Sequence, residues 1–115
     1  MPVWFYYAKP SDRTDERQEY LATFKQIRPG LLQLDWMSNA LPDQYQGCGI
    51  TRALVPRVAE KHGARVRSSR NRPHEGETHT TAARKVWLSL LNDNLACYDA
   101  AEERFYHPDV PPGAA

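Results

Sequence analysis

Strand-like and helix-like segments alternate along this chain of 115 residues, and the alternation limits the possible folds more than any other feature. Residues 2–8 are β-branched and aromatic, and residues 31–37 alternate apolar with polar side chains, as is typical of strands. A short strand is expected at 64–69. Residues 95–98 and 104–107 are expected to pair as a hairpin. The intervening segments predict helices packed on this sheet.

The first helix is expected to begin at a cap on Ser11 or Asp12 and to end at Arg28, where Pro29-Gly30 stops it. Apolar residues recur there at the spacing of one helical face, namely Tyr20, Leu21, Phe24 and Ile27.

Two further helices follow. One runs from Gly49 to His62, with Gly63 as its C-terminal stop and with a kink or a late start because of Pro56. The other is expected to begin at a cap on Thr80 or Thr81, and its apolar stripe includes Trp87.

The predicted order is β-α-β-α-β-α-β(β), an α/β (α+β) fold with a single mixed sheet and packed helices. We expect one domain at residues 1–108 and a disordered tail at 109–115. Trp36 and Trp87 are expected in the core. Aromatic residues occupy both faces of the first strand, so that strand is either covered on both sides or meets another chain with one face.

Composition indicates a small folded domain with a thin core. Leu, Ile, Val and Phe together number only 21, but the net charge of +1 argues against disorder. No apolar run has the length of a membrane span, and the first residues lack the pattern of a secretory signal. Two cysteines cannot form a disulfide framework, so a cytoplasmic location is expected.

The segment between the strand at 31–37 and the helix at 49–62 carries the strongest chemical signal. It reads Pro42-Asp-Gln-Tyr-Gln-Gly-Cys-Gly-Ile-Thr51. Glycines at a strand-to-helix junction let backbone N–H groups approach an anion at the helix N-terminus, so a phosphate or pyrophosphate is the expected ligand. No Gly-Lys-Ser/Thr follows, and the dinucleotide pattern Gly-x-Gly-x-x-Gly is absent.

This segment resembles the acetyl-CoA loop of the GNAT family of N-acetyltransferases, which reads Arg/Gln-x-x-Gly-x-Gly/Ala. Gln46–Thr51 fits with Thr51 in place of the final small residue, and a shifted register over 44–49 fits literally. We prefer the first register, because Ile50 and Leu54 then match the apolar helix positions that usually follow. The resemblance covers roughly residues 31–107.

The resemblance implies an acyl-CoA N-acyltransferase that moves acetyl from acetyl-CoA to an amine of a small molecule or protein. It assigns the CoA pyrophosphate to the backbone amides of Gln46, Gly47, Cys48, Gly49, Ile50 and Thr51, and the pantetheine arm to Ala40 and Leu41. Tyr98 is the candidate acid that protonates the departing thiolate. Asp35, Glu75 and Glu77 are candidate bases, and Asn71, His74 and Glu77 are candidate substrate contacts.

The chain departs from the family before its candidate CoA-binding strand. One strand and one helix are expected there, whereas the family normally has two helices and three strands that build much of the acceptor site. A homodimer could supply the missing wall.

Two other functions stay open at this point. A non-catalytic binding or inhibitory protein could keep the same fold. A nucleic-acid binder could use the basic run Lys61, Arg65, Arg67, Arg70 and Arg72. The net charge of +1 and the lack of a nucleic-acid-binding motif favour a solvated strand face and loop instead. His74 and His79 lie five residues apart rather than four, so no metal site is expected.

Overall fold

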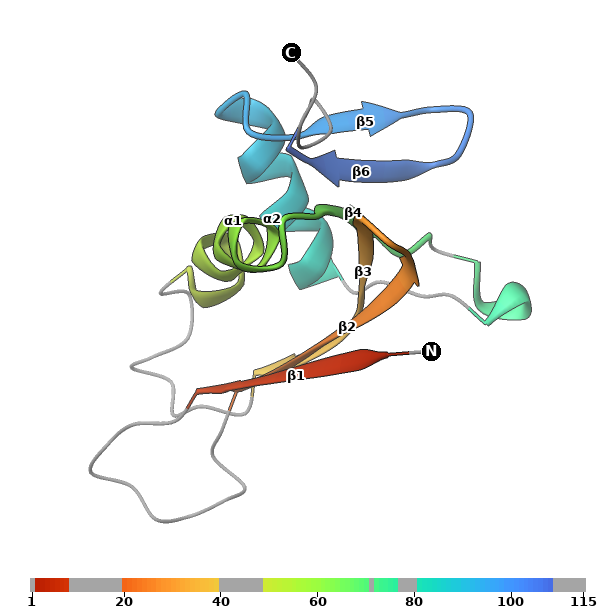
Figure 1. The fold of residues 1–115 in the computed structure, drawn as a ribbon. Coiled ribbons are helices and arrows are strands. Elements are labelled where there is room, and N and C mark those ends of the chain that lie inside the picture. Colours follow the sequence, from red (N-terminus) through yellow and green to blue (C-terminus); the bar gives the residue numbers. More distant parts are fainter. Residues whose placement is uncertain (1, 9–19, 40–48, 71, 77–80, 109–115) are drawn as a thin grey trace.

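The computed structural model describes residues 2–8, 20–39, 49–70, 72–76 and 81–108. These residues form a six-stranded mixed sheet and two α-helices (Figure 1). Along the chain the elements are β1 (Val3–Ala8), β2 (Tyr20–Arg28), β3 (Leu31–Asn39), α1 (Ile50–His62), β4 (Arg65–Ser68), the 3-10 turn η2 (Pro73–Glu75), α2 (Thr81–Asn92), β5 (Cys97–Asp99) and β6 (Arg104–His107).

The sheet combines two antiparallel parts with one parallel pair. Its strand order is β1-β2-β3-β4-β6-β5. Strands β1, β2 and β3 form an antiparallel meander, and β5 and β6 form the predicted hairpin. Strand β4 joins these parts, because it pairs in parallel with β3 and antiparallel with β6. The prediction of one mixed sheet with packed helices is therefore confirmed.

The predicted first helix is wrong where the structure describes it, because residues 20–28 form strand β2. Tyr20, Ala22 and Phe24 point into the core at a period of two, and the spacing of Tyr20 and Phe24 also fits a helix. Pro29-Gly30 is a hairpin turn and not a helix stop. Pro followed by Gly with φ of 84° matches a type II turn, which leads directly into β3.

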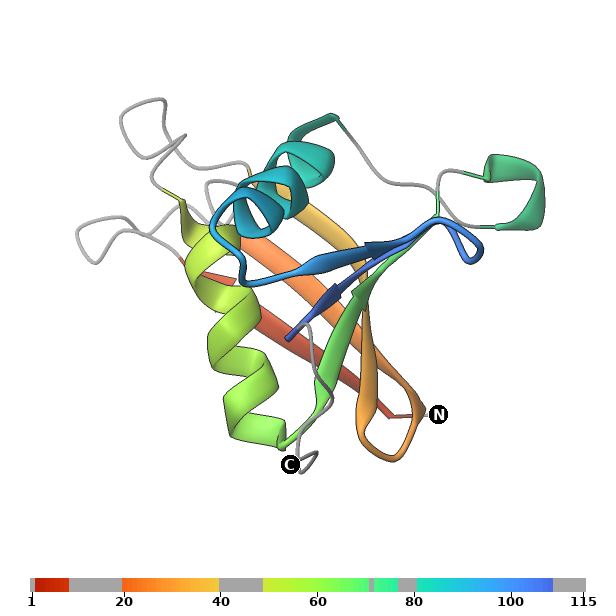
Figure 2. The same cartoon turned by 90° about the horizontal axis from the view of Figure 1, so that it is seen from above.

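Both helices lie on the same face of the sheet (Figure 2). Helix α1 begins at Ile50 and contains Pro56 in its interior, so the expected late start is wrong. It ends as predicted at Gly63, whose φ of 56° is left-handed. Arg52 on α1 donates to Ser89 on α2 and pairs with Asp93, which fastens the two helices together.

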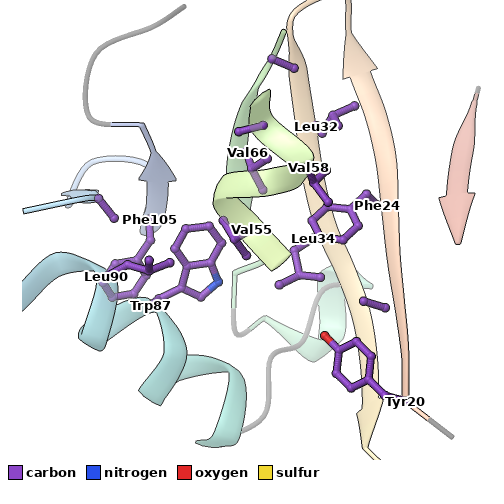
Figure 3. Close-up of a cluster of buried hydrophobic side chains, with 14 residues drawn as sticks. Tyr20, Phe24, Leu32, Leu34, Val55, Val58, Val66, Trp87, Leu90 and Phe105 are labelled. Carbon is purple, nitrogen blue, oxygen red and sulfur yellow. The ribbon is translucent and has the colours of Figure 1, made fainter. Parts of the chain in front are cut away.

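One apolar core fills the space between the helices and the sheet (Figure 3). Trp87 from α2 lies beside Val55 of α1, with Phe24 and Leu34 of the meander beyond. The prediction that Trp87 is a core residue is confirmed. Trp36 is not in the core, because a register shift in β3 turns it to the other face of the sheet, where it is 55% exposed.

Candidate functional site

Strands β3 and β4 separate partway along the sheet. They pair in parallel from Leu31↔Arg65 to Leu34↔Ser68, and β4 ends there. Strand β3 continues to Asn39 with β2 as its partner. Within the described residues, the β4-facing edge of β3 beyond Leu34 therefore meets no further strand, and its outward backbone N–H and C=O groups could receive a ligand.

A β-bulge lies at the point of separation. Thr23 pairs with Trp36 and Phe24 with Leu34, so Asp35 has no partner on β2. A bulge bends its strand and increases the local twist, which turns β3 away from β4. The Asp35 carboxylate lies 3.3 Å from Lys25 Nζ, so one of the three candidate bases is located at the bulge.

The N-terminus of α1 follows the end of β3. Its N-cap, Gly49, has φ of 77°, which confirms the expected need for glycine at this junction. Neither a side-chain cap nor an acidic first-turn residue is found for this helix among the described residues. The first N–H groups of a helix have no intrahelical acceptor, so those of Ile50, Thr51 and Arg52 can receive an anion.

Thr51 holds the start of α1 against the sheet. Its buried hydroxyl lies 2.6 Å from the Tyr20 hydroxyl at the beginning of β2 and 3.6 Å from the sulfur of Met37 near the end of β3. Burial raises the pKa of Tyr20, and the hydrogen bond to Thr51 opposes that rise. The contact places the N-terminus of α1 beside the end of β3 where the two strands have separated.

The described residues include only part of the predicted site. Gly49, Ile50 and Thr51 form the start of α1, and His74 and Glu75 lie exposed on η2. Seven predicted positions lie outside the described residues, namely Ala40, Leu41, Gln46, Gly47, Cys48, Asn71 and Glu77.

Salt bridges position η2 near the tip of the β5–β6 hairpin. Glu75 pairs with Arg70 and Arg72, and Arg72 also donates to Glu103 with an Nε–Oε2 distance of 2.7 Å. Bonding to Glu103 is the main cause that raises the pKa of Arg72. His74 is therefore carried on a turn that is anchored to the hairpin.

Tyr98 lies on β5, the outermost strand, and β6 separates it from β4. Adjacent strands are about 4.8 Å apart, so β5 is roughly 10 Å from β4 across the sheet. The Tyr98 ring packs on Phe105, with ring centroids 4.7 Å apart. The structure therefore places this candidate acid to one side of the point where β3 and β4 separate.

A buried polar cluster on the sheet face opposite the helices was missed by sequence reasoning. The Gln33 Oε1 atom accepts hydrogen bonds from Arg67 Nε at 2.9 Å and from Arg104 Nη1 at 3.1 Å. Gln33 and Arg104 are 1% and 5% exposed. The sequence does contain a polar residue at this position, since Gln33 lies between Leu32 and Leu34 in β3. However, the alternation of apolar and polar residues alone predicts that its side chain is solvated.

The cations of the basic run make separate contacts within the chain. Arg65 donates to the Pro108 carbonyl and lies over the Tyr106 ring, and Arg67 donates to Gln33. Lys61 lies over the Tyr6 ring on the helix side of the sheet. Lys61 therefore lies on the other side of the sheet from Arg65 and Arg67, which share one face of β4.

No group of three or more metal-ligating side chains occurs in the part of the chain that the structure describes. In the same residues, no helix is long and apolar enough to cross a membrane. The chain matches no family model, and it matches no curated protein and no solved structure.

Proposed function

We propose that the chain binds acetyl-CoA where β3 and β4 separate and that it transfers the acetyl group to an amine. One observation carries this proposal. A parallel β3-α1-β4 unit separates after four residue pairs, and the N-terminus of α1, which no side chain of the described residues caps, lies beside the end of β3. This arrangement fits the resemblance to the GNAT family, in which the loop amides bind the CoA pyrophosphate and the preceding strand pairs with pantetheine.

The corrected fold supports the proposal further. The meander puts two strands, β1 and β2, before the candidate CoA-binding strand β3. The family normally has three strands there, so recognising β2 as a strand brings this part of the chain closer to the family pattern. The two family helices have no counterpart among the described residues. The sheet face opposite α1 and α2 includes the exposed Trp36.

The backbone would bind both ends of the cofactor arm. The N–H groups at the start of α1, together with Gln46–Cys48, would bind the pyrophosphate through the partial positive charge of the helix terminus. The free edge of β3 beyond Leu34 would pair with the amides of pantetheine. Ala40 and Leu41 follow this edge directly in the sequence.

The transfer needs an amine in its neutral form. Its nitrogen attacks the thioester carbon, a C–N bond forms, the C–S bond breaks, and the CoA thiolate leaves and takes a proton. Of the two candidate bases that the structure describes, Asp35 lies on β3 itself and Glu75 lies on η2, so Asp35 would accept the proton of the amine, directly or through water. Backbone N–H groups of β3 would stabilise the oxyanion.

A non-catalytic protein with the same fold is the second candidate. The observation that favours it is the position of Tyr98 on β5, which leaves the protonation of the thiolate without an assigned residue. Such a protein would bind acetyl-CoA without accelerating its breakdown.

Thermal unfolding with acetyl-CoA tests the binding step. A ligand at a hundredfold excess over its Kd stabilises the folded state by about 2.7 kcal/mol. For a domain of this size, that corresponds to a rise in Tm on the order of 10 °C. The absence of any shift at millimolar acetyl-CoA would contradict the proposal.

A matched pair of variants at Gly49 locates the binding. Asp and Asn both tolerate a left-handed backbone, and a Cβ at Gly49 would meet no atom of the described residues within 4 Å, so the two variants differ mainly in charge. Gly49→Asp is expected to abolish the shift by repelling the pyrophosphate, and Gly49→Asn is expected to keep most of it. Equal loss in both variants would argue against an anion site at the start of α1.

Release of the CoA thiol separates the two candidates. Slow thioester hydrolysis without an acceptor, or faster release with a panel of amines, would indicate catalysis. A thermal shift without any thiol release above the uncatalysed rate would favour the non-catalytic protein.

A further inference from the structure

Strand β1 forms one edge of the sheet, and none of the described residues pairs with its outer side. Its sequence, Val-Trp-Phe-Tyr-Tyr-Ala, has six residues without a charge, a proline or a glycine. Proteins normally protect sheet edges with short strands, charges, prolines or bulges. The opposite edge, β5, follows this rule, since it has three residues and includes Asp99.

The hydrogen bonding of β1 to β2 shows which backbone groups face outward. Gln26 N–H donates to the Pro2 carbonyl at 3.0 Å, so Pro2 faces β2. In an antiparallel pair, alternate residues face the partner strand, so Trp4 and Tyr6 also bond to β2. Val3, Phe5 and Tyr7 therefore direct their N–H and C=O groups away from the sheet.

The same three residues direct their side chains away from the helices. Val3, Phe5 and Tyr7 are 43%, 57% and 62% exposed, whereas Trp4 and Tyr6 pack against the core. The edge of β1 therefore combines outward-facing backbone groups with a row of exposed apolar side chains.

We propose that two copies of the chain pair through β1, antiparallel about a two-fold axis at Phe5. Phe5 would then lie opposite Phe5 of the second copy, and Val3 opposite Tyr7. This register matches every outward-facing residue of one strand with an outward-facing residue of the other, and each pair exchanges two backbone hydrogen bonds. The two sheets become one continuous sheet.

Self-complementarity favours a second copy over a different protein. A two-fold interface needs a surface that fits itself, and an uncharged strand brings no like charges together. Aromatic–aromatic and aromatic–β-branched pairs are the favourable cross-strand combinations, and this register forms only such pairs on the exposed face. Pairing also removes the unprotected edge and leaves β5 at both ends of the joined sheet.

The mass of the full chain in solution tests this proposal, by light scattering or sedimentation. At high micromolar concentration we expect twice the 13.2 kDa of one chain. Phe5→Pro removes one N–H group that faces away from β2, so no hydrogen bond to β2 is lost. Proline is tolerated at such an edge position, where the N–H group faces solvent. Phe5→Lys places a charge at the two-fold axis. Each is expected to weaken dimerisation at least about 30-fold, the size of a lost interface hot spot.

Two further variants keep the test independent of misfolding. Phe5→Thr retains strand propensity and the N–H group and is expected to weaken the dimer less than Phe5→Lys. Trp36→Lys alters the same exposed face away from the edge and is expected to leave the dimer intact. A monomer at all concentrations, a dimer that survives Phe5→Pro and Phe5→Lys, or equal loss with Trp36→Lys would overturn edge pairing. None of these outcomes depends on acetyl-CoA.

Discussion

His62, at the C-terminal end of α1, links this helix to strand β1. Its Nε2 atom lies 2.6 Å from the Tyr6 hydroxyl, and its ring lies 4.7 Å from the Trp4 ring between centroids. A neutral imidazole can accept the hydroxyl hydrogen at Nε2, whereas a protonated one cannot. Burial, and after it the charge of Lys61, lowers the pKa of His62. Burial and the Lys61 charge therefore favour the neutral ring at the contact between α1 and β1.

This contact predicts a loss of stability in mild acid. Because the folded-state pKa of His62 lies below its unfolded value of about 6.5, the unfolded chain binds more protons below that pH. The free energy of unfolding is expected to fall as the pH drops from about 6.5 towards the folded-state pKa. His62→Gln is expected to reduce this dependence, as measured by urea denaturation at several pH values.

His74 provides the matched control, since it is an exposed histidine on η2. His74→Gln is expected to leave the pH dependence of the free energy of unfolding below pH 6.5 as in the parent chain. If His62→Gln and His74→Gln change the slope equally, the link between α1 and β1 is not its source.

At the scale of elements, the Pro29-Gly30 turn decides how the first half of the chain folds. It connects β2 to β3, and the Gly30 carbonyl accepts a hydrogen bond from Arg65 N–H at 2.9 Å, which also ties the turn to β4. A left-handed residue at this position lets two antiparallel strands follow each other directly.

Substitutions at Gly30 test the turn. In the part of the chain that the structure describes, a Cβ there would meet no atom within 4 Å, so the cost comes from the φ of 84°. Gly30→Val is expected to lower the free energy of unfolding by about 1–3 kcal/mol, because β-branched residues strongly disfavour this conformation. Gly30→Asn is expected to cost clearly less. Equal costs in urea denaturation would contradict a left-handed turn.

The spacing of the apolar residues in β2 explains why the sequence predicted a helix there. Tyr20 and Phe24 lie four residues apart, a spacing that satisfies both a strand and a helix, and Leu21 and Ile27 completed an apparent helical face. The decisive contacts are between strands, since Phe24 pairs with Leu34 of β3 and Trp4 of β1. A single segment does not contain that information.

Elements with strong local signals were predicted well. Helix α2 begins at Thr81, in agreement with the expected cap on Thr80 or Thr81, and Gly63 ends α1 as predicted. The hairpin of β5 and β6 was also predicted. The burial of Gln33 was not predicted. It depends on two guanidinium groups from β4 and β6, and these strands are distant from β3 in the sequence.

At the scale of the whole molecule, one part of the candidate site follows from its own sequence segment, and the other depends on pairing between strands. The left-handed Gly49 follows from the glycine pattern of its own segment. The bulge at Asp35 and the separation of β3 from β4 depend on how three strands pair. The glycine pattern therefore indicated a ligand loop, and only the family resemblance pointed to the strand beside it.

The position of β4 also has a consequence for the speed of folding. The β1–β2–β3 meander and the β5–β6 hairpin contain contacts between neighbours in the sequence, which form quickly. Strand β4 reaches β3 only across α1, and it reaches β6 only across α2. Its four residues close the sheet and are expected to dock last, after the rate-limiting barrier.

Val66, fully buried at the centre of β4, reports on this step. Val66→Ala is expected to cost about 2 kcal/mol through lost burial and a cavity. Nearly all of that cost is expected in faster unfolding, about 30-fold, with little change in the folding rate. Phe24→Leu in the meander is expected to slow folding instead. Stopped-flow measurement of the folding and unfolding rates of both variants against denaturant concentration checks this prediction. It would show whether β4, at the centre of the sheet, is the strand that docks last.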